Sequence, residues 1–403
     1  MTVEGGHPVT AGGVAPSALQ RGQNAGTAPA FCPRNVGSQL RPLFVNENIG
    51  GNATMHLHLR AALAAHHPGV AARFLDVPAR GILRRVAGAA VPGLSRLDLD
   101  LAPLRGQLAL SAHVRRRLSR WNDPFDVLHV YTHNAALLSV DLLRRNPTVV
   151  GLDATSEQSL QLLPYRKPTR FTALASKPGR AFEQRVYDAA DAIVVKSEWA
   201  KRSLLAGYRV AESKVELIPY GITVPDVPSV PRDGATIAFV GRSMARKGGW
   251  LLLEAWRRRL RRDAQLVLIT PETVPAEPGL TVINDIRGGD PRLHNVLASA
   301  SVLAFPSTGD TFGYAALEAM ALRTPVVAAD AAAMPEIITT GHDGLLVPPD
   351  DADALAEALA GVLGDTLGWR RMGDAARQTV LERFDARRTT AQVVELLTRV
   401  AQR

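Results

Sequence analysis

The sequence predicts an α/β fold with two doubly wound parallel sheets that face a central cleft. Strand-like runs rich in Val, Ile and Leu alternate with helical segments in the first half of the chain, and the same alternation restarts at Thr236. Between the halves lies a stretch with three prolines, Thr223 to Asp233. Proline cannot continue a helix or a central strand, so this stretch marks a boundary between two domains.

The chain of 403 residues is long enough for two or three domains and divides into five parts. Residues 1–39 are rich in Gly, Ala and Pro without apolar periodicity, and we expect a disordered tail. Residues 40–224 and 235–384 are the two α/β domains, and residues 225–234 link them. Residues 385–403 form a last helix.

The composition is that of a soluble globular protein, with 46% hydrophobic and 21% charged residues. No apolar run approaches the roughly 20 residues that span a bilayer, and the N-terminus lacks a secretory pattern. A single cysteine, Cys32, excludes an internal disulfide and a multi-cysteine zinc site. These features predict a cytoplasmic protein without a bound metal.

Positive charge is concentrated in the first half. Residues 1–230 carry 27 Lys and Arg against 17 Asp and Glu, or +10, whereas the remainder carries 20 against 21, or −1. The excess could attract an acidic acceptor, the anionic inner face of a membrane, or nucleic acid, and it could also serve solubility alone. The basic helical run 113–120 is either a lipid contact or an ordinary solvated helix face.

Strand and helix patterns can be placed along most of the first domain. Strands are predicted at 41–46, 72–77, 126–131, 148–152, 192–196 and 215–219, and helices at 53–65, 182–190 and 197–205. Residues 78–125 show no clear pattern apart from the basic run. Gly50 and Gly51, which precede the first helix, permit a ligand to approach the backbone. His133 follows the 126–131 strand, where ligands bind in such sheets, although an ordinary loop histidine is the alternative.

The second domain repeats the alternation. Strands are predicted at 236–240, 265–269, 280–283, 302–305, 325–329 and 345–347, and helices at 249–262, 292–300, 313–322, 352–363, 367–383 and 386–402. Arg242 and Lys247 flank the entrance of one helix, where two cations and free amides could neutralise a diphosphate, and Arg246 could substitute for either. Exposed loop charges are the alternative interpretation.

The most informative stretch is F-P-S-T-G-D-T-F-G-Y-A-A-L-E, residues 305–318. A strand leads through a short turn into a helix N-terminus, which favours an anion such as phosphate. Asp310 lies before the helix and Glu318 follows along it, and both carboxylates can accept hydrogen bonds from sugar hydroxyls. Together these groups suit a sugar nucleotide, whereas an acidic cap and a surface Glu are the plainer interpretation.

In these motifs the chain resembles the retaining glycosyltransferases of family 4, which use nucleotide sugars and have the GT-B fold of two Rossmann-like domains. The resemblance covers about residues 41–400. It rests on the order and spacing of the segments V-V-K-S-E-W-A-K (194–201), L-I-P-Y-G-I (217–222), F-V-G-R-S-M-A-R-K-G-G (239–249), the 305–320 stretch, T-P-V-V-A (324–328) and G-H-D-G-L-L-V (341–347).

The resemblance implies roles for individual residues. Arg242 and Lys247 would hold the donor diphosphate, and the amides around Phe312 and Gly313 would approach the sugar and phosphates. Glu318 would accept from the ribose and Asp310 from the transferred sugar. The glycines at 50 and 51 would close over the phosphates, and the last helix would cross back to the first domain.

Three positions depart from the family pattern. Asp310 replaces the first Glu of the E-x7-E motif, which shortens its reach by one methylene. Tyr220 stands where Asn is usual, and Tyr131 stands at the second His of an H-x-H pattern, whose role we assign to His133. The D-x-D triplet 98–100, which metal-dependent glycosyltransferases use, is read here as a surface turn.

The predicted activity is metal-independent transfer of a hexose from a UDP- or GDP-sugar to the hydroxyl of a glycan, lipid-linked sugar or small molecule, with no cofactor and no nucleic-acid partner. No general base stands out, which fits the front-face mechanism proposed for the family. The alternatives are another GT-B enzyme, such as a sugar-nucleotide epimerase or a phosphorylase, a non-catalytic sugar-nucleotide-binding subunit, and a nucleic-acid-binding protein. The sequence argues against nucleic-acid binding, because its basic residues are not interleaved with aromatic residues that could stack on bases.

Overall fold

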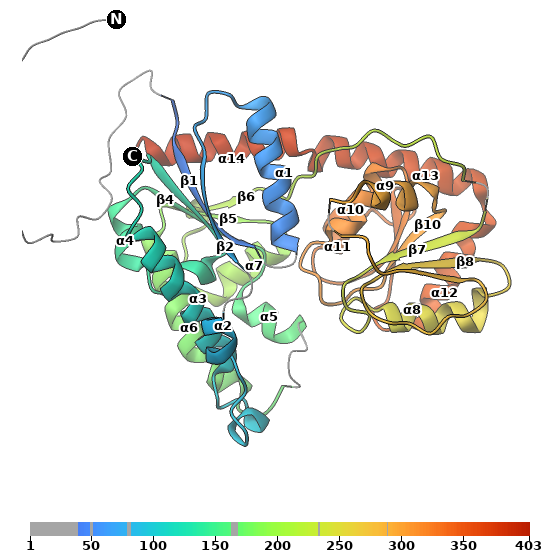
Figure 1. Cartoon of the computed structure of the whole chain (residues 1–403), viewed down its shortest axis with the longest axis horizontal. Coiled ribbons are helices and arrows are strands. Elements are labelled where there is room, and N and C mark those ends of the chain that lie inside the picture. Colours follow the sequence, from blue (N-terminus) through green and yellow to red (C-terminus); the bar gives the residue numbers. More distant parts are fainter. Residues whose placement is uncertain (1–38, 49–50, 79–81, 163–167, 233, 288) are drawn as a thin grey trace, which may run out of the picture.

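The computed structural model describes residues 39–48, 51–78, 82–162, 168–232, 234–287 and 289–403, arranged as two α/β bodies side by side (Figure 1). The predicted disordered tail, apart from residue 39, and Gly50 lie outside the described residues.

The first body contains a six-stranded parallel sheet in the order β2-β1-β3-β4-β5-β6. Its strands are β1 (Pro42–Asn48), β2 (Arg73–Pro78), β3 (Val127–Tyr131), β4 (Thr148–Leu152), β5 (Ala192–Val195) and β6 (Val215–Leu217). The central strands β3, β4 and β5 are buried along their whole length, as expected for a sheet covered by helices on both faces.

The second body contains another six-stranded parallel sheet in the order β12-β11-β10-β7-β8-β9. Its strands are β7 (Thr236–Val240), β8 (Gln265–Ile269), β9 (Leu280–Ile283), β10 (Val302–Phe305), β11 (Val326–Ala329) and β12 (Gly344–Val347). The predicted fold class, two doubly wound parallel sheets, is confirmed.

Helices surround both sheets (Figure 1). They are α1 (Gly51–His66), α2 (Ile82–Ala87), α3 (Ala102–Leu118), α4 (Val140–Arg145), α5 (Ser156–Leu162), α6 (Thr172–Ala189), α7 (Glu198–Gly207), α8 (Gly249–Ala255), α9 (Pro291–Ser299), α10 (Tyr314–Ala321), α11 (Met334–Ile337), α12 (Ala352–Gly364), α13 (Thr366–Thr379) and α14 (Ala386–Ala401). Short 3-10 turns include η1 (Leu94–Leu97) and η2 (His133–Ala136), and π-helical turns extend α8 and α13. Ser197 caps α7 by accepting from the Ala200 amide at 3.1 Å.

Two features of the first body were not predicted from the sequence. Residues 78–125 contain α2, η1 and α3, and the long helix α3 buries Leu110, Val114 and Leu118 at intervals of four. That period is present in the sequence, but the surrounding arginines and Gly106 obscured it. Helix α6 begins ten residues earlier than predicted and continues through Pro178.

The C-terminal helix crosses from the second body to the first (Figure 1). Helix α14 packs on α1 and buries Val393, Leu397 and Val400 in the same hydrophobic cluster as Phe44 of β1. The chain passes between the bodies twice, near Ile222 and near Asp385, and these two segments are hydrogen-bonded to each other. The Ile222 amide donates to the Phe384 carbonyl and the Ala386 amide donates to the Ile222 carbonyl, both at 2.8 Å. The bodies are thus joined by paired crossings and a shared helix.

Each sheet has one point where successive connections run in opposite directions, and ligands bind at such switch points in open α/β sheets. In the second sheet it lies between β7 and β10, and in the first between β1 and β3. The loops that leave these strands therefore carry the candidate site.

Candidate active site

The loops after β7 and β10 touch each other at the switch point of the second sheet. Gly248 has a left-handed φ of 72°, and a Cβ at this position would lie 2.3 Å from the Pro306 carbonyl oxygen. Only glycine allows this approach, because the crowding atom belongs to backbone. The contact brings Lys247 to Asp310, and their side chains form an ion pair.

This ion pair is largely removed from water. The side chains of Lys247 and Asp310 are 18% and 13% exposed. Burial lowers the pKa of Lys247, while the charge of Asp310 opposes that shift. Arg246 adds a second cation 3.6 Å from Asp310 and donates to the Gly309 carbonyl at 3.3 Å. A phosphate that enters here must compete with Asp310 for Lys247, and a sugar hydroxyl must compete with Lys247 for Asp310.

Helix α10 begins beside this pair. Its N-cap, Gly313, has a φ of 95°, and a Cβ there would lie 3.0 Å from both the Met334 sulfur and the Phe305 ring. The Phe312 side chain is buried against Tyr220, with ring centroids 5.0 Å apart. The Phe312 ring thus belongs to the core, and what this turn can offer a ligand is the set of amides in the first turn of α10.

Glu318 lies one turn further along α10. Burial raises the pKa of its carboxyl from 4.5 to about 7. Among the residues that the structure describes, no side chain or amide donates a hydrogen bond to this carboxylate, and no cation pairs with it. A half-buried carboxylate without a donor is ready to accept hydrogen bonds from hydroxyl groups of a ligand. The sugar-nucleotide interpretation of this residue therefore has a physical basis in its surroundings.

The first body presents its own helix N-terminus to the same place. A Cβ on Gly51, the first residue of α1, would lie 3.5 Å from the Tyr314 ring at the start of α10. Two turns later, His58 stacks on Tyr314 with ring centroids 6.1 Å apart. The N-termini of α1 and α10 therefore face each other across the junction of the two bodies.

Asp153 is a site residue that the sequence reasoning did not single out. It follows β4 at the carboxyl edge of the first sheet and accepts a hydrogen bond from the Thr311 hydroxyl at 3.0 Å. Thr311 lies between Asp310 and Phe312, so Asp153 contacts the loop after β10 from the opposite body. The position of Asp153 at a strand's carboxyl end was the signal that could have identified it.

Lys196 directly follows β5 and lies in the segment V-V-K-S-E-W-A-K (194–201), but the sequence patterns assign it no role of its own. It is 5% exposed, and burial lowers the pKa of its ammonium group to about 8, against the opposing effect of Asp153. Its nitrogen lies 5.7 Å from the Tyr131 ring centroid and 5.3 Å from that of Tyr220. A buried cation thus lies next to the two tyrosine rings between the bodies.

Two departures from the family pattern, Tyr131 and Tyr220, meet in the structure. Their hydroxyl groups hydrogen-bond to each other, and both rings are buried. Burial, together with the nearby carboxylate of Asp153, raises the pKa of both phenols well above the usual value, so both stay neutral. The two tyrosines therefore depend on each other, because replacing one of them would leave the buried hydroxyl of the other without its hydrogen-bond partner.

The structure does not bring His133 together with the other predicted site residues. Its imidazole is 3% exposed, and Nε2 lies 2.9 Å from the Glu183 carboxylate on α6. The same carboxylate accepts from Ser156 and Tyr208. His133 is thus part of a buried hydrogen-bond network. Arg242, by contrast, is exposed on the loop after β7 that also carries Lys247.

The described residues contain no helix long and apolar enough to cross a membrane. Nor do they contain a group of three or more His, Cys, Asp or Glu residues placed to hold a metal ion. Of the predicted turn at 98–100, Asp98 ends η1 in a left-handed conformation and Asp100 is buried, accepting from the Val91 amide at 3.1 Å. That triplet stabilises the connection between α2 and α3.

Comparison with known proteins agrees with this geometry. Residues 49–224 match the Glycosyltransferase Family 4 model, and residues 234–365 match the model of Glycosyl transferases group 1. A phosphatidyl-myo-inositol mannosyltransferase of Mycobacterium leprae is 29% identical over 80% of this chain and 90% of its own. The MMP alpha-(1->4)-mannosyltransferase of Mycolicibacterium hassiacum is 32% identical, but the match covers only 53% of this chain and 55% of that protein.

Solved structures share the fold. Sucrose-phosphate synthase from Thermosynechococcus elongatus superposes with a TM-score of 0.66 at 20% identity, covering 90% of this chain and 99% of that one. The Anabaena protein HepE, solved with UDP and glucose, superposes with a TM-score of 0.63 at 16% identity, covering 89% and 99%. The two family models together span most of both bodies, and the chain is a GT-B glycosyltransferase that belongs to family 4.

Proposed function

We propose that the protein transfers a hexose from a UDP- or GDP-sugar to an acceptor hydroxyl, with retention of configuration at the anomeric carbon. The observation that carries this proposal is the ion pair of Lys247 and Asp310 beside the N-terminus of α10, with Glu318 further along that helix and the start of α1 opposite it. Cations and helix amides suit a diphosphate, and carboxylates suit sugar hydroxyls.

The names of similar proteins support the substrate class. Relatives include phosphatidyl-myo-inositol mannosyltransferases and D-inositol 3-phosphate glycosyltransferases, and HepE was solved with UDP-glucose. These names favour a nucleotide sugar as donor and a hydroxyl of a polar acceptor. The acceptor would lie over the carboxyl edge of the first sheet, beside Asp153.

The proposed reaction breaks the bond between the anomeric carbon and the diphosphate oxygen, and the acceptor oxygen bonds to the same face of that carbon. The nucleoside diphosphate leaves with the electron pair, and one of its phosphate oxygens takes the acceptor proton. Arg242, Lys247 and the α10 amides stabilise the charge that develops on the leaving group. We propose that these groups suffice without a divalent metal or another cofactor.

Closure of the two bodies over the donor would exclude water and limit its hydrolysis. The hydrogen bond between Thr311 and Asp153 is one contact that such closure would use. The Glu336 carboxylate of α11 is another, because it accepts from the Glu198 and Trp199 amides at the start of α7, at 2.7 and 2.6 Å. We further propose a cytoplasmic location, with contact to an anionic membrane surface through the basic first half.

A donor screen tests the proposal. Thermal unfolding is followed with UDP-, GDP- and ADP-sugars in EDTA, and release of the diphosphate is measured in parallel, because a ligand of the native state raises its apparent stability. We expect one nucleotide to raise the unfolding temperature and to be released slowly without acceptor. A stability shift without release would support a binding subunit, and conversion of the donor sugar without transfer would support an epimerase.

Failure of every sugar nucleotide to bind would contradict the proposal as a whole. Loss of turnover in EDTA that Mn²⁺ or Mg²⁺ restores would contradict only metal independence. Retention is read separately, from the anomeric configuration of the product by NMR.

A further inference from the structure

Exposed apolar side chains are concentrated in one part of the first body. Of the eleven large hydrophobic side chains that are exposed among the described residues, six lie in α2, in the connection from α2 to α3, or in the first turn of α6. They are Val86 (66% exposed), Val91 (37%), Leu94 (47%), Leu97 (41%), Leu99 (37%) and Leu174 (55%). We name residues 84–101 and 168–177 the apical segment; it forms the end of the projection that α2, α3 and α6 build in Figure 1.

The apical segment is held in place by polar contacts at its base. Arg105 donates to the Ala89 carbonyl at 2.7 Å and to the Asp100 carbonyl at 2.8 Å. Thr169 donates to the Leu97 carbonyl at 3.1 Å, and Thr172 donates to the Asp98 carboxylate, which ties the start of α6 to η1. The exposed leucines thus project from an ordered support.

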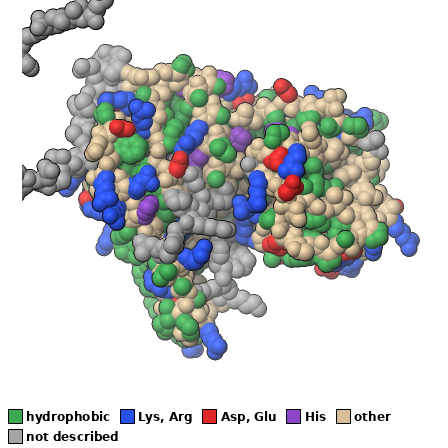
Figure 2. Space-filling model, in the orientation of Figure 1, with side chains coloured by type: hydrophobic (Ala, Val, Ile, Leu, Met, Phe, Trp, Pro, Cys, Tyr) green, Lys and Arg blue, Asp and Glu red, His purple; other side chains and the backbone are tan. Residues whose placement is uncertain are grey.

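The charges of the apical segment have one sign at its surface. The exposed charged side chains are Arg85, Arg96, Arg170 and Lys177. The two acidic side chains, Asp98 and Asp100, are engaged in the hydrogen bonds of the support, and Asp100 is only 6% exposed. In Figure 2 green apolar and blue cationic side chains lie together over this projection. Leucines beside arginines, without exposed acids, complement an anionic lipid interface.

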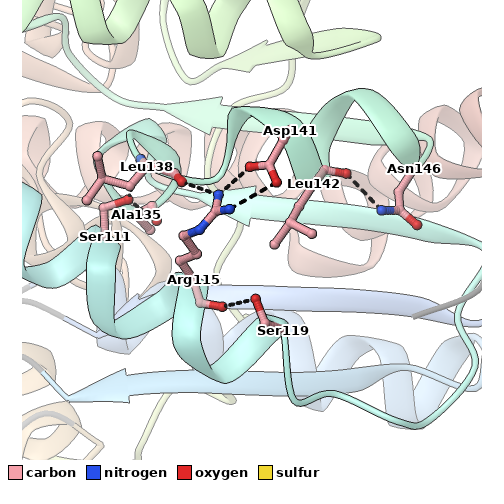
Figure 3. Close-up of polar contacts among 8 residues, drawn as sticks. All are labelled: Ser111, Arg115, Ser119, Ala135, Leu138, Asp141, Leu142 and Asn146. Carbon is pink, nitrogen blue, oxygen red and sulfur yellow. Dashed lines mark hydrogen bonds and ion pairs between the residues drawn. The ribbon is translucent and has the colours of Figure 1, made fainter. Parts of the chain in front are cut away.

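The basic run 113–120 lacks this combination. Its apolar residues, Val114 and Leu118, are buried in the core. Arg115 binds the Asp141 carboxylate and the Leu138 carbonyl of the neighbouring helix and loop (Figure 3). What remains at the surface is charge without apolar side chains, which is the solvated helix face that the sequence left as an alternative.

We infer that the apical segment is the surface through which this protein binds an anionic membrane, with its leucines in the lipid interface and its arginines at lipid phosphates. The inference rests on the membrane contact proposed above and identifies its residues. It does not depend on turnover, because lipid binding and transfer to a water-soluble acceptor are measured separately.

Vesicle flotation of the full chain tests the inference. We expect binding to phosphatidylcholine vesicles that contain about one third phosphatidylglycerol, weaker binding to phosphatidylcholine alone, and release at high salt. The double variant Leu94→Ser/Leu97→Ser should bind at least about tenfold more weakly. Leu367→Ser is the matched control, since Leu367 is 70% exposed on α13 of the other body, and it should bind as the wild type does.

A second variant, Arg85→Gln/Arg96→Gln, tests the charge separately and keeps every leucine. We expect about a fivefold loss of binding for each arginine removed. Undiminished binding of both double variants, or no binding of the wild type to anionic vesicles, would overturn the inference. So would a concentration-dependent dimer of the wild type that Leu94→Ser/Leu97→Ser dissociates, because the leucines would then cover a second copy. Unchanged unfolding temperatures show that the variants are folded.

Discussion

The two bodies share a parallel six-stranded sheet but use it differently. In the second body, short loops after β7 and β10 bring Lys247 and Asp310 into contact, and the net charge of that half is close to zero. The first body carries the excess of positive charge and a long helical insertion between β2 and β3. The candidate site of the second body therefore depends on loops fixed by the strands they leave, whereas the first body adds surface far from its sheet.

The largest expected effect on turnover is that of a substitution at Glu318, the proposed acceptor of donor hydroxyls in the second body. Glu318→Gln should lower kcat/KM for the donor by about 10³, because the amide offers one acceptor oxygen fewer to the donor hydroxyls in a half-buried site. The unfolding temperature at pH 8 should not fall, since burial disfavours the charge that the substitution removes. Glu357→Gln, at an exposed position of α12, is the control. Wild-type turnover of Glu318→Gln would remove the central assignment.

The ion pair at the switch point comes next. Asp310→Asn and Lys247→Met should each lower kcat/KM by about 10², because each leaves a largely buried charge without its partner and removes a ligand contact. In a double-mutant cycle the combined loss should be clearly smaller than the product of the single losses. Independent, multiplying effects would show that the two side chains do not act together. Asp374→Asn, exposed on α13, serves as control.

The contact between the bodies has a smaller expected effect. Asp153→Asn and Thr311→Val should each lower kcat about tenfold, since each weakens one hydrogen bond between the first sheet and the donor loop. Thr308→Val, three residues earlier in the same loop, should leave kcat unchanged. If Asp153→Asn is as active as Thr308→Val, the first body does not contribute through Asp153.

A pH dependence of a few fold should follow from Glu318. Its pKa is raised from 4.5 to about 7, so its ionisation costs stability as the pH rises through that range. Donor hydroxyls need the ionised carboxylate as acceptor, and donor affinity should therefore rise between about pH 6 and pH 8. Calorimetric titration of the nucleotide sugar at three pH values measures this. Glu318→Gln should lack the rise, and an identical rise in that variant would assign it elsewhere.

The smallest effect on turnover is expected at His133. His133→Asn should lower the free energy of unfolding by about 1–3 kcal/mol, because Glu183 loses one of its buried partners, and should leave kcat within a few fold. Chemical denaturation and a turnover assay test the two parts. A hundredfold loss of kcat with unchanged stability would return His133 to the donor site, as the sequence predicted.

The sequence was most informative where chemistry and strand position coincide. The twelve strands of the described residues all lie where apolar runs in the sequence predict them, because strands of parallel sheets covered by helices read as largely hydrophobic segments. Lys247, Asp310 and Glu318 were identified from the loop and helix that follow β7 and β10. Asp153 and Lys196 end strands in the same way, but neither belongs to a turn or helix pattern that suggests ligand binding.

The sequence by itself determined the fold class and the position of the loops after β7 and β10, since these depend on local periodicity and glycine. Only the tertiary structure decided which side chains meet. The pairing of Tyr131 with Tyr220, of Thr311 with Asp153 and of His133 with Glu183 joins residues between 50 and 158 positions apart. The same holds for the leucines of the apical segment, whose exposure depends on how α3 and α6 pack. Local sequence patterns do not predict which distant residues come into contact, because these contacts depend on how the elements pack.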